Sequence, residues 1–257
     1  LLKMSAKAQH KHSAKVKQEQ EHKRKADYEK YKVDFNEKYQ KTKRELAKDP
    51  FGTKYLDIKN YLEEADEQFL SKMIEFNSEN IETHILGAEI YRKTGQHIKA
   101  LKSINKSLKM DPNNPYIHCE LLKLYHNFEN SSKPFDKLTS MVLSRSRTTL
   151  IGDPKTESLE SFNEQYIQRN KTKYLHHCLA SISHHQLFSK TKADSKLEIN
   201  YYQTACMNFG TVCSKTTVDD ITTIFYILRD RLQDDKFLVL FKQSVQKAYP
   251  LIEVVRD

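Results

Sequence analysis

Residues 81–114 read IETHILGAEIYRKTGQHIKALKSINKSLKMDPNN, and this stretch decides the fold. Its small residues and its turn residues stand where a pair of packed helices needs them. The small side chains of Ala88 and Ala100 let two helices approach closely, and Gly95 permits a tight turn between them. Pro112 ends the second helix because proline cannot continue one comfortably. The stretch therefore predicts two helices that are joined at Gly95.

The same 34 residues match the pattern of one tetratricopeptide repeat, in which small, aromatic and turn residues occupy fixed positions. The matching residues are Ala88 at position 8, Tyr91 at position 11, Gly95 in the turn, Ala100 at position 20, Ile104 at position 24 and Pro112 at position 32. One repeat cannot bury its own apolar face, so its neighbours should also be helical pairs that stack into a solenoid. We predict an all-α fold: a tetratricopeptide-like helical-repeat domain over residues 50–257, preceded by a long basic helix over residues 1–49.

Apolar residues recur at helical spacing on both sides of the repeat. The segments with this pattern are 55–76, 116–128, 159–188, 198–213, 218–232 and 237–249. The whole chain of 257 residues has only 5 Gly, 6 Pro and no Trp, whereas 30% of its residues are charged, which favours helices over a β-sandwich or a collagen-like chain. No stretch approaches the roughly 20 apolar residues of a membrane span. We therefore expect a helical protein that has no membrane partner.

The formal net charge of +9 is concentrated at the start of the chain. Residues 1–48 hold 15 basic and 7 acidic side chains, whereas residues 49–257 hold 28 basic and 27 acidic ones. The first 49 residues contain neither Gly nor Pro and consist mainly of strong helix formers, and Pro50 and Gly52 then provide a stop. These residues, 1–49, are called the basic arm below, and their composition predicts one long helix.

The first half of the basic arm carries a ridge of cations. The candidate contacts to nucleic-acid phosphates are Lys11, Lys15, Lys17, Lys23, Arg24 and Lys25. Lys and Arg contacts to phosphates give salt-dependent affinity that does not depend on nucleic-acid sequence. A solvated basic tail that only keeps the chain soluble accounts for the same residues equally well. The charge pattern alone leaves both interpretations open.

The second half of the basic arm carries an apolar stripe. Its members, which lie along one face of a helix, are Tyr28, Tyr31, Phe35, Tyr39 and Leu46. Aromatic residues at this spacing more often dock a helix onto a protein body than stack on bases, so we favour docking.

Sequence patterns of known catalytic and cofactor sites are missing. The chain has no phosphate-binding glycine loop, dinucleotide fingerprint, HExxH zinc motif or GxSxG nucleophile motif. Residues 92–95, Arg-Lys-Thr-Gly, resemble the first half of the loop with which acetyltransferases hold acetyl-CoA, but His97 stands where that loop has Gly or Ala. The predicted turn already explains Gly95. We therefore predict no catalytic residue and no cofactor.

Two histidine pairs near one cysteine raise the question of a metal site. His176 and His177 precede Cys178, and His184 and His185 follow it. Eight residues separate the pairs, which is about two helical turns and too far along one helix for a single ion. The four cysteines of the chain have no CxxC spacing and form no disulfide framework. We predict no metal site, helix packing for the histidines, and reduced thiols in a cytosolic or nuclear protein.

Two blocks of residues carry a resemblance to a known family. The first consists of residues 81–84 (IETH), 88–93 (AEIYRK), the DPxxP turn at 111–115 and His118. The second consists of Phe162-Asn163, Tyr166-Ile167 and Arg169-Asn170, followed by Leu175, His177 and Leu179. With the basic stretch in front of them, the two blocks resemble the C-terminal region of the auxiliary, ribosome-anchoring subunit of the N-terminal acetyltransferase A (NatA) complex. Members of that family often follow the basic tract with an acidic run, which this chain lacks at residues 48–50.

The resemblance implies a non-catalytic scaffold, the C-terminal part of a large α-solenoid that wraps and shapes a separate catalytic subunit. That subunit transfers acetyl groups from acetyl-CoA to nascent-chain N-termini. The implied partners are the catalytic acetyltransferase subunit, further subunits of the complex, and ribosomal RNA held by the basic arm from Lys3 to Arg44. The implied location is cytoplasmic and ribosome-associated, with the nucleus as a second one. The opening Leu1-Leu2, without an initiator Met, leads us to expect a piece of a longer chain.

Two other functions stay open at this point. One is a free-standing protein-interaction scaffold or chaperone adaptor, in which the basic arm would serve nuclear import. Chaperone-binding repeats hold a C-terminal carboxylate with Lys and Asn at positions 5 and 9, but Ile85 and Glu89 stand there in this chain, which disfavours such a clamp. The other is a chain that acetylates alone, which the incomplete glycine loop disfavours.

Overall fold

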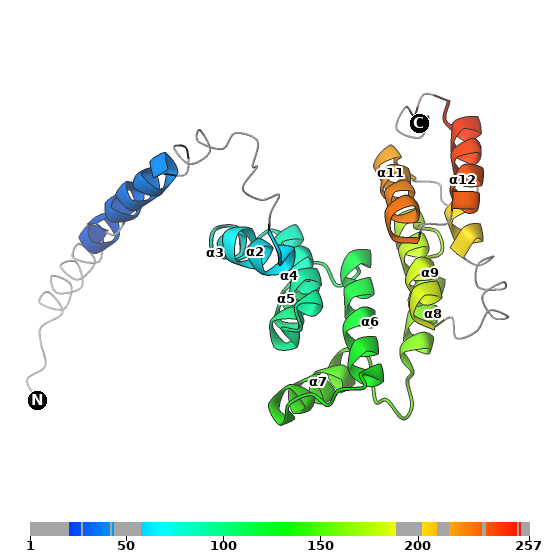
Figure 1. The fold of residues 1–257 in the computed structure, drawn as a ribbon, viewed down its shortest axis with the longest axis horizontal. Helices are drawn as coiled ribbons and strands as arrows, with labels where there is room; N and C mark the ends of the chain where they lie inside the picture. The colour runs from blue at the N-terminus through cyan, green and yellow to red at the C-terminus, as the bar shows by residue number, and fades with distance from the viewer. Residues whose placement is uncertain are drawn as a thin grey trace, which may run out of the picture. The chain divides into compact units, whose positions relative to one another are not determined.

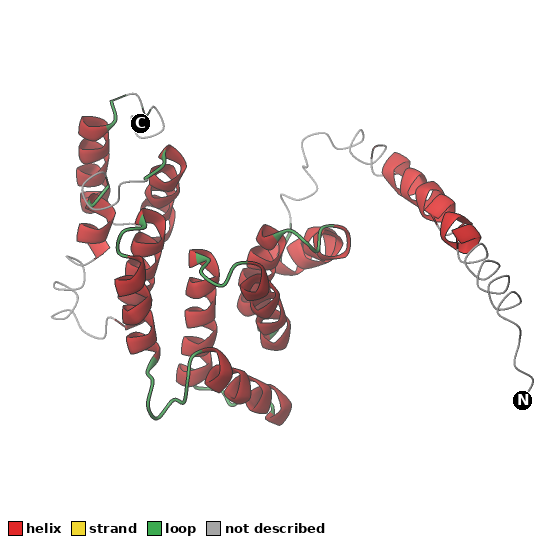
Figure 2. Ribbon diagram, turned by 180° about the vertical axis from the view of Figure 1, so that it is seen from behind, coloured by secondary structure: helices red, strands yellow, loops and turns green. Residues whose placement is uncertain are grey.

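The computed structural model describes residues 21–26, 28–41, 43, 58–188, 202–209, 216–232, 235–250 and 252. The chain divides into two compact units, Leu1–Asn60 and Tyr61–Asp257. The predicted boundary between residues 49 and 50 lies outside the described residues and stays a prediction. The described residues form helices and contain no β-strand (Figures 1 and 2), which confirms the predicted all-α, helical-repeat fold.

In the first unit, the described residues of the basic arm are helical. They cover 21–26, 28–41 and 43, and every one of them is exposed to solvent. The remainder of the predicted long helix, including Lys11, Lys15 and Lys17, lies outside the described residues. Helix formation here agrees with the run of Lys, Glu, Gln, Arg and Ala side chains, which lose little conformational freedom in a helix.

The second unit begins with one continuous helix that contains a π-helical turn. Its parts are α2 (Tyr61–Ala65), η2 (Asp66–Leu70) and α3 (Ser71–Phe76). The π-helical turn buries Leu70, which is 1% exposed, and leaves Phe69 in solvent. This helix packs against α4 (Ile81–Lys93), so the repeat has the N-terminal neighbour that it needs to cover its apolar face.

The predicted repeat forms two packed helices, α4 and α5 (His97–Met110). The side chains of Ala88, Tyr91, Ala100 and Ile104 are all buried. Gly95 has a φ of +76°, a left-handed conformation that glycine adopts at little cost, and it lies in the turn between the helices. Pro112 lies in the exposed turn after α5.

Sequence reasoning missed one position in the repeat, Gly87. A Cβ atom at Gly87 would lie 2.9 Å from the hydroxyl oxygen of Ser103 on α5. The glycine therefore allows the two helix backbones to approach closely. Its neighbour Ala88 met the repeat pattern, but only the register of α4 against α5 reveals the need for glycine at 87.

The next two pairs of helices are α6 (Pro115–Asn130) with α7 (Lys137–Leu150), and α8 (Leu159–Asn170) with α9 (Tyr174–Phe188). Side chains cap three of these helices: Asn114 accepts from the amides of Tyr116 and Ile117, Asp136 from that of Thr139, and Ser158 from that of Ser161. These caps satisfy amides that a helix start leaves unpaired, which fixes where each helix begins.

The C-terminal part contains helical residues 202–207, α11 (Val218–Ile227), a π-helical segment η3 (Leu228–Leu232) and α12 (Asp235–Ala248). A capping box at Thr217 and Asp220 starts α11. Contacts run from α4 to α6, from α6 to α9 and from α9 to α11, so these helices follow one another through the unit (Figure 1).

Two large apolar clusters hold the second unit together. One spans α4 to α7 and includes Ala88, Ile104, Tyr125 and Leu143, and the other joins α9 to α11 and α12. None of the described helices combines the length and the apolar character that a membrane crossing requires.

Candidate functional site

The exposed cations of the basic arm are the first candidate surface. Lys23, Arg24 and Lys25 are exposed, so their charged groups can reach a partner. Lys25 forms an ion pair of 3.1 Å with Glu21, but both side chains are more than two-thirds exposed. Exposed ion pairs of this kind contribute only about 0–1 kcal/mol to stability. Lys25 therefore remains able to bind other anions.

The aromatic stripe of the basic arm is exposed as well. Tyr28, Tyr31, Phe35 and Tyr39 have 52–64% of their surface in solvent, and the rings of Tyr31 and Phe35 stack at 6.3 Å. Residues 28, 31, 35 and 39 share one helical face, while Lys23, Lys30 and Lys41 share another because they are seven and eleven residues apart. The helix therefore offers an aromatic face and a cationic face. Docking of the aromatic face onto a protein body stays a prediction.

A buried polar junction joins the two sequence blocks that carry the family resemblance. The Nε2 atom of His118 on α6 lies 2.9 Å from the Oδ1 atom of Asn163 on α8, and the amide nitrogen of Asn163 donates to the carbonyl of Ala180 on α9 over 3.1 Å. The ring of Tyr166 stacks on His118 at 3.7 Å, and its hydroxyl donates to the carbonyl of Asn113. The junction connects three helices, so its residues have a structural role.

His118 gives this junction a defined pH dependence. Burial lowers the pKa of its imidazole to about 4 from 6.5. Between pH 6.5 and pH 4, His118 binds a proton in the unfolded chain but not in the folded chain. The free energy of unfolding therefore falls as the pH falls. His118→Gln removes this titration. We expect wild-type stability, relative to the variant, to fall by about 2 kcal/mol between pH 7 and pH 5, measured by urea unfolding at each pH.

Comparison with the variant isolates His118, because burial lowers the pKa of His176 and His177 in the same direction in both proteins. The variant also loses a ring stack, but that loss is nearly independent of pH. Parallel stability curves for wild type and variant from pH 7 to pH 5 would contradict the assignment.

The segment that resembles half of an acetyl-CoA loop contributes to helix packing. The Nε atom of Arg92 donates to Glu120 on α6 over 2.8 Å, and Lys123 contacts the other carboxylate oxygen of Glu120 at 2.8 Å. The side chain of Glu120 is only 6% exposed, so its charge requires these partners. His97 packs its ring against Phe135 at 4.8 Å. These contacts and the left-handed Gly95 account for the motif without a cofactor.

A groove lies between α4, α6, α9 and α11, with a volume of about 350 Å³. Ile85 and Glu89, the residues at the clamp positions of the repeat, both line it. Cys119 lies in its wall and directs its thiol to the carbonyl of Leu179, 3.6 Å away. No histidine lines the groove in the described part of the chain. The wall of the groove is mixed polar and apolar, which suits binding.

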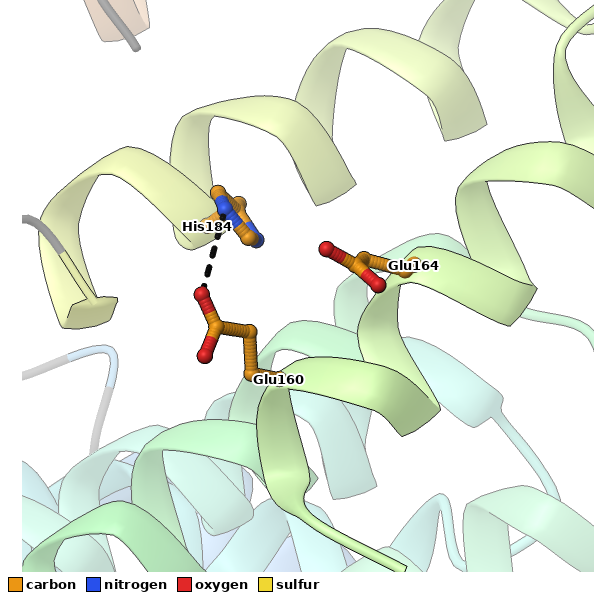
Figure 3. A group of neighbouring side chains, drawn as sticks. All are labelled: Glu160, Glu164 and His184. Atoms are coloured by element: carbon orange, nitrogen blue, oxygen red, sulfur yellow. Dashed lines mark ion pairs between the residues drawn. The ribbon is translucent and has the colours of Figure 1, made fainter.

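The histidine pairs on α9 do not converge on one point. His176 stacks on Tyr166 at 6.3 Å, and His185 packs against Tyr202 at 4.9 Å. His184 faces α8, where its Nε2 atom lies 3.8 Å from Oε1 of Glu160. With Glu164, these two residues form a group whose ligand atoms all lie within 4.8 Å of one another (Figure 3). Sequence reasoning considered the histidines along a single helix and missed the carboxylates of the neighbouring helix.

The described residues define a class of protein: a helical-repeat protein with a basic helix, whose buried polar groups maintain helix packing. Comparison with known proteins then shows which family the chain is similar to. Residues 1–107 match the family model described as N-terminal acetyltransferase A, auxiliary subunit. The human N-alpha-acetyltransferase 16, NatA auxiliary subunit, is 31% identical over 142 residues, which are 55% of this chain and 16% of the human protein.

Two further similar proteins are also named as auxiliary subunits. The mouse N-alpha-acetyltransferase 16, NatA auxiliary subunit, is 28% identical over 140 residues, 54% of this chain and 16% of the mouse protein. The N-terminal acetyltransferase A complex auxiliary subunit NAA15 of Arabidopsis thaliana is 26% identical over 131 residues, 50% of this chain and 14% of the plant protein. The chain is thus similar to NatA auxiliary subunits over about half of its length, which confirms the resemblance found in its sequence. The matched region spans about one sixth of the length of these curated relatives.

Proposed function

We propose that the chain is part of a non-catalytic auxiliary subunit of an N-terminal acetyltransferase complex and supports a separate catalytic subunit. The observation that carries this proposal is the family match over residues 1–107, which includes all of α4 and most of α5. The relatives are named as auxiliary subunits. A scaffolding role needs a helical body with a fixed arrangement of helices, and the junction at His118 and Asn163 supports one.

The chemistry of the described residues supports a non-catalytic role for this chain. Arg92 and Gly95, which belong to the segment that resembles half of an acetyl-CoA loop, serve an ion pair and a turn. His118 is engaged by Asn163, and burial lowers its pKa to about 4, so it is neutral at pH 7 and enclosed in the body. The acetyl group and its donor would therefore be handled by the catalytic subunit.

The basic arm is proposed to anchor the complex to ribosomal RNA. Its excess of 15 basic over 7 acidic side chains in residues 1–48 supports electrostatic binding to a polyanion, and the exposure of Lys23, Arg24 and Lys25 leaves their charges accessible. This anchor would place the complex in the cytoplasm on ribosomes, with the nucleus as a second location.

Reconstitution tests the proposed scaffold. The full-length protein is co-expressed with catalytic acetyltransferase subunits from the same organism, purified through a tag on the auxiliary chain, and assayed for acetyl transfer to peptides with free N-termini. We expect one catalytic subunit to co-purify, and turnover to require it. Acetyl transfer by the auxiliary chain alone would refute the non-catalytic role. Recovery of chaperones, without an acetyltransferase or ribosomes, would favour an adaptor instead.

A further inference from the structure

Glu160, Glu164 and His184 bring three metal-ligating side chains together at the surface between α8 and α9. The two glutamates are four residues apart, so they lie on consecutive turns of the same face of α8. His184 comes from α9, which packs against α8. Figure 3 shows the imidazole of His184 and both carboxylates directed toward a common space. The ligand atoms of all three lie within 4.8 Å of one another.

The distances suit an ion between the side chains better than a direct contact. His184 Nε2 and Glu160 Oε1 are 3.8 Å apart, which is longer than a hydrogen bond. A tetrahedral zinc ion with bonds of about 2.1 Å holds its ligand atoms roughly 3.4 Å apart. Small rotations of the glutamate side chains would bring all three ligands to that spacing.

The charges at this surface also favour a cation. Glu160 and Glu164 repel each other at their spacing of four residues. None of the ion pairs found among the described residues joins a Lys or Arg to either carboxylate, in contrast to Glu120, which two cations neutralise. A divalent ion would supply the missing positive charge.

The imidazole is held more firmly than the carboxylates. The side chain of His184 is only 12% exposed and its ring packs 5.3 Å from that of Phe188, whereas the side chain of Glu160 is 47% exposed and Glu164 is exposed. The two exposed carboxylates have room to turn toward an ion beside the largely buried nitrogen ligand without a movement of the helices. Imidazole with carboxylates suits zinc and similar transition metals, whereas Mg²⁺ and Ca²⁺ prefer oxygen ligands alone.

We propose that Glu160, Glu164 and His184 form a binding site for a divalent transition metal of the zinc class. Water completes the tetrahedron as the fourth ligand. The bound ion connects α8 to α9. It acts close to the hydrogen bond from Asn163 to the carbonyl of Ala180, which joins the same two helices. The site is independent of the proposed role in acetylation, because its ligands and its consequence lie within this chain.

Calorimetric titration of the full chain with ZnCl₂ at pH 7.5 tests the site. We expect saturable binding at micromolar concentration that the double variant Glu160→Gln/Glu164→Gln weakens at least tenfold. Zinc at 100 times the dissociation constant should raise the Tm of the wild type by about 5–10 °C, since it binds the folded state preferentially. Mg²⁺ at the same concentration should leave the Tm unchanged.

The matched control is Glu63→Gln/Glu67→Gln, which removes two exposed carboxylates at the same spacing without a histidine opposite them. It should bind zinc as the wild type does. His184→Gln should lose zinc binding as the glutamate variant does, and circular dichroism verifies that the His184→Gln protein is folded. If that protein does not fold, the glutamate variant still tests the site, because both glutamates are exposed. Equal zinc binding by the wild type and the Glu160→Gln/Glu164→Gln variant, or no binding below about 100 μM, would overturn the proposal.

Discussion

Replacing Ala88 by Trp is expected to destabilise the packed pair of α4 and α5 by more than about 3 kcal/mol. Ala88 is 1% exposed, and Ala100 on the facing helix is fully buried. The neighbouring Gly87 shows how little space separates the helices, since even a Cβ atom there would approach Ser103 to 2.9 Å. An indole ring at position 88 must therefore push the helices apart or force them out of register.

The measurement is urea unfolding followed by far-UV circular dichroism. The control is Leu86→Trp on the same helix, where the side chain is 42% exposed and an indole can extend into solvent. We expect the control to change stability by less than about 1 kcal/mol. An Ala88→Trp protein as stable as the control would mean that the close approach of α4 and α5 is not required for folding.

The repeat could be predicted because its requirements are local. Gly95 and Ala100 act through the turn and the helix contact that lie within the same 34 residues, so a known pattern finds them. The repeat pattern did not predict the need for glycine at position 87, because that need depends on which atom of α5 faces it. A repeat motif gives the helices and their order, whereas the register of one helix against the next depends on packing.

The helices after the repeat illustrate the limit of periodicity. Residues 159–188 form one segment with apolar residues at helical spacing, but the structure divides them into α8 and α9 at residues 171–173. Those residues are Lys-Thr-Lys, and neither Gly nor Pro marks the break. Tertiary packing thus ends α8, with Asn170 exchanging hydrogen bonds with Asn113 across 57 residues of sequence. Such contacts have no local sequence pattern.

The group of Glu160, Glu164 and His184 shows the same limit for a site. The spacing of the two glutamates was visible in the sequence, and so was the histidine. The break between α8 and α9 was not predicted. On one uninterrupted helix, about 20 residues would separate Glu164 from His184, which is a distance of roughly 30 Å. The turn at 171–173 folds α9 back against α8, which places His184 opposite the glutamates.

Reversing six charges of the basic arm is expected to abolish ribosome binding by the complex. The variant replaces Lys11, Lys15, Lys17, Lys23, Arg24 and Lys25 by Glu. If each of these cations contacts one phosphate, counterion release makes wild-type affinity fall about a thousandfold between 50 and 200 mM salt. The variant replaces that attraction with repulsion. Co-sedimentation of the intact complex with ribosomes, at rising salt, measures both effects.

The control must change the net charge by the same amount at a different place. Six exposed lysines of the second unit serve this purpose: Lys102, Lys109, Lys133, Lys137, Lys155 and Lys173. Their reversal should leave most ribosome binding intact, because the basic arm holds the excess charge of the chain and the remainder is close to neutral. Unchanged binding by the arm variant would remove the arm from the anchor. Equal losses from both variants would mean that ribosomes respond to net charge and not to the basic arm.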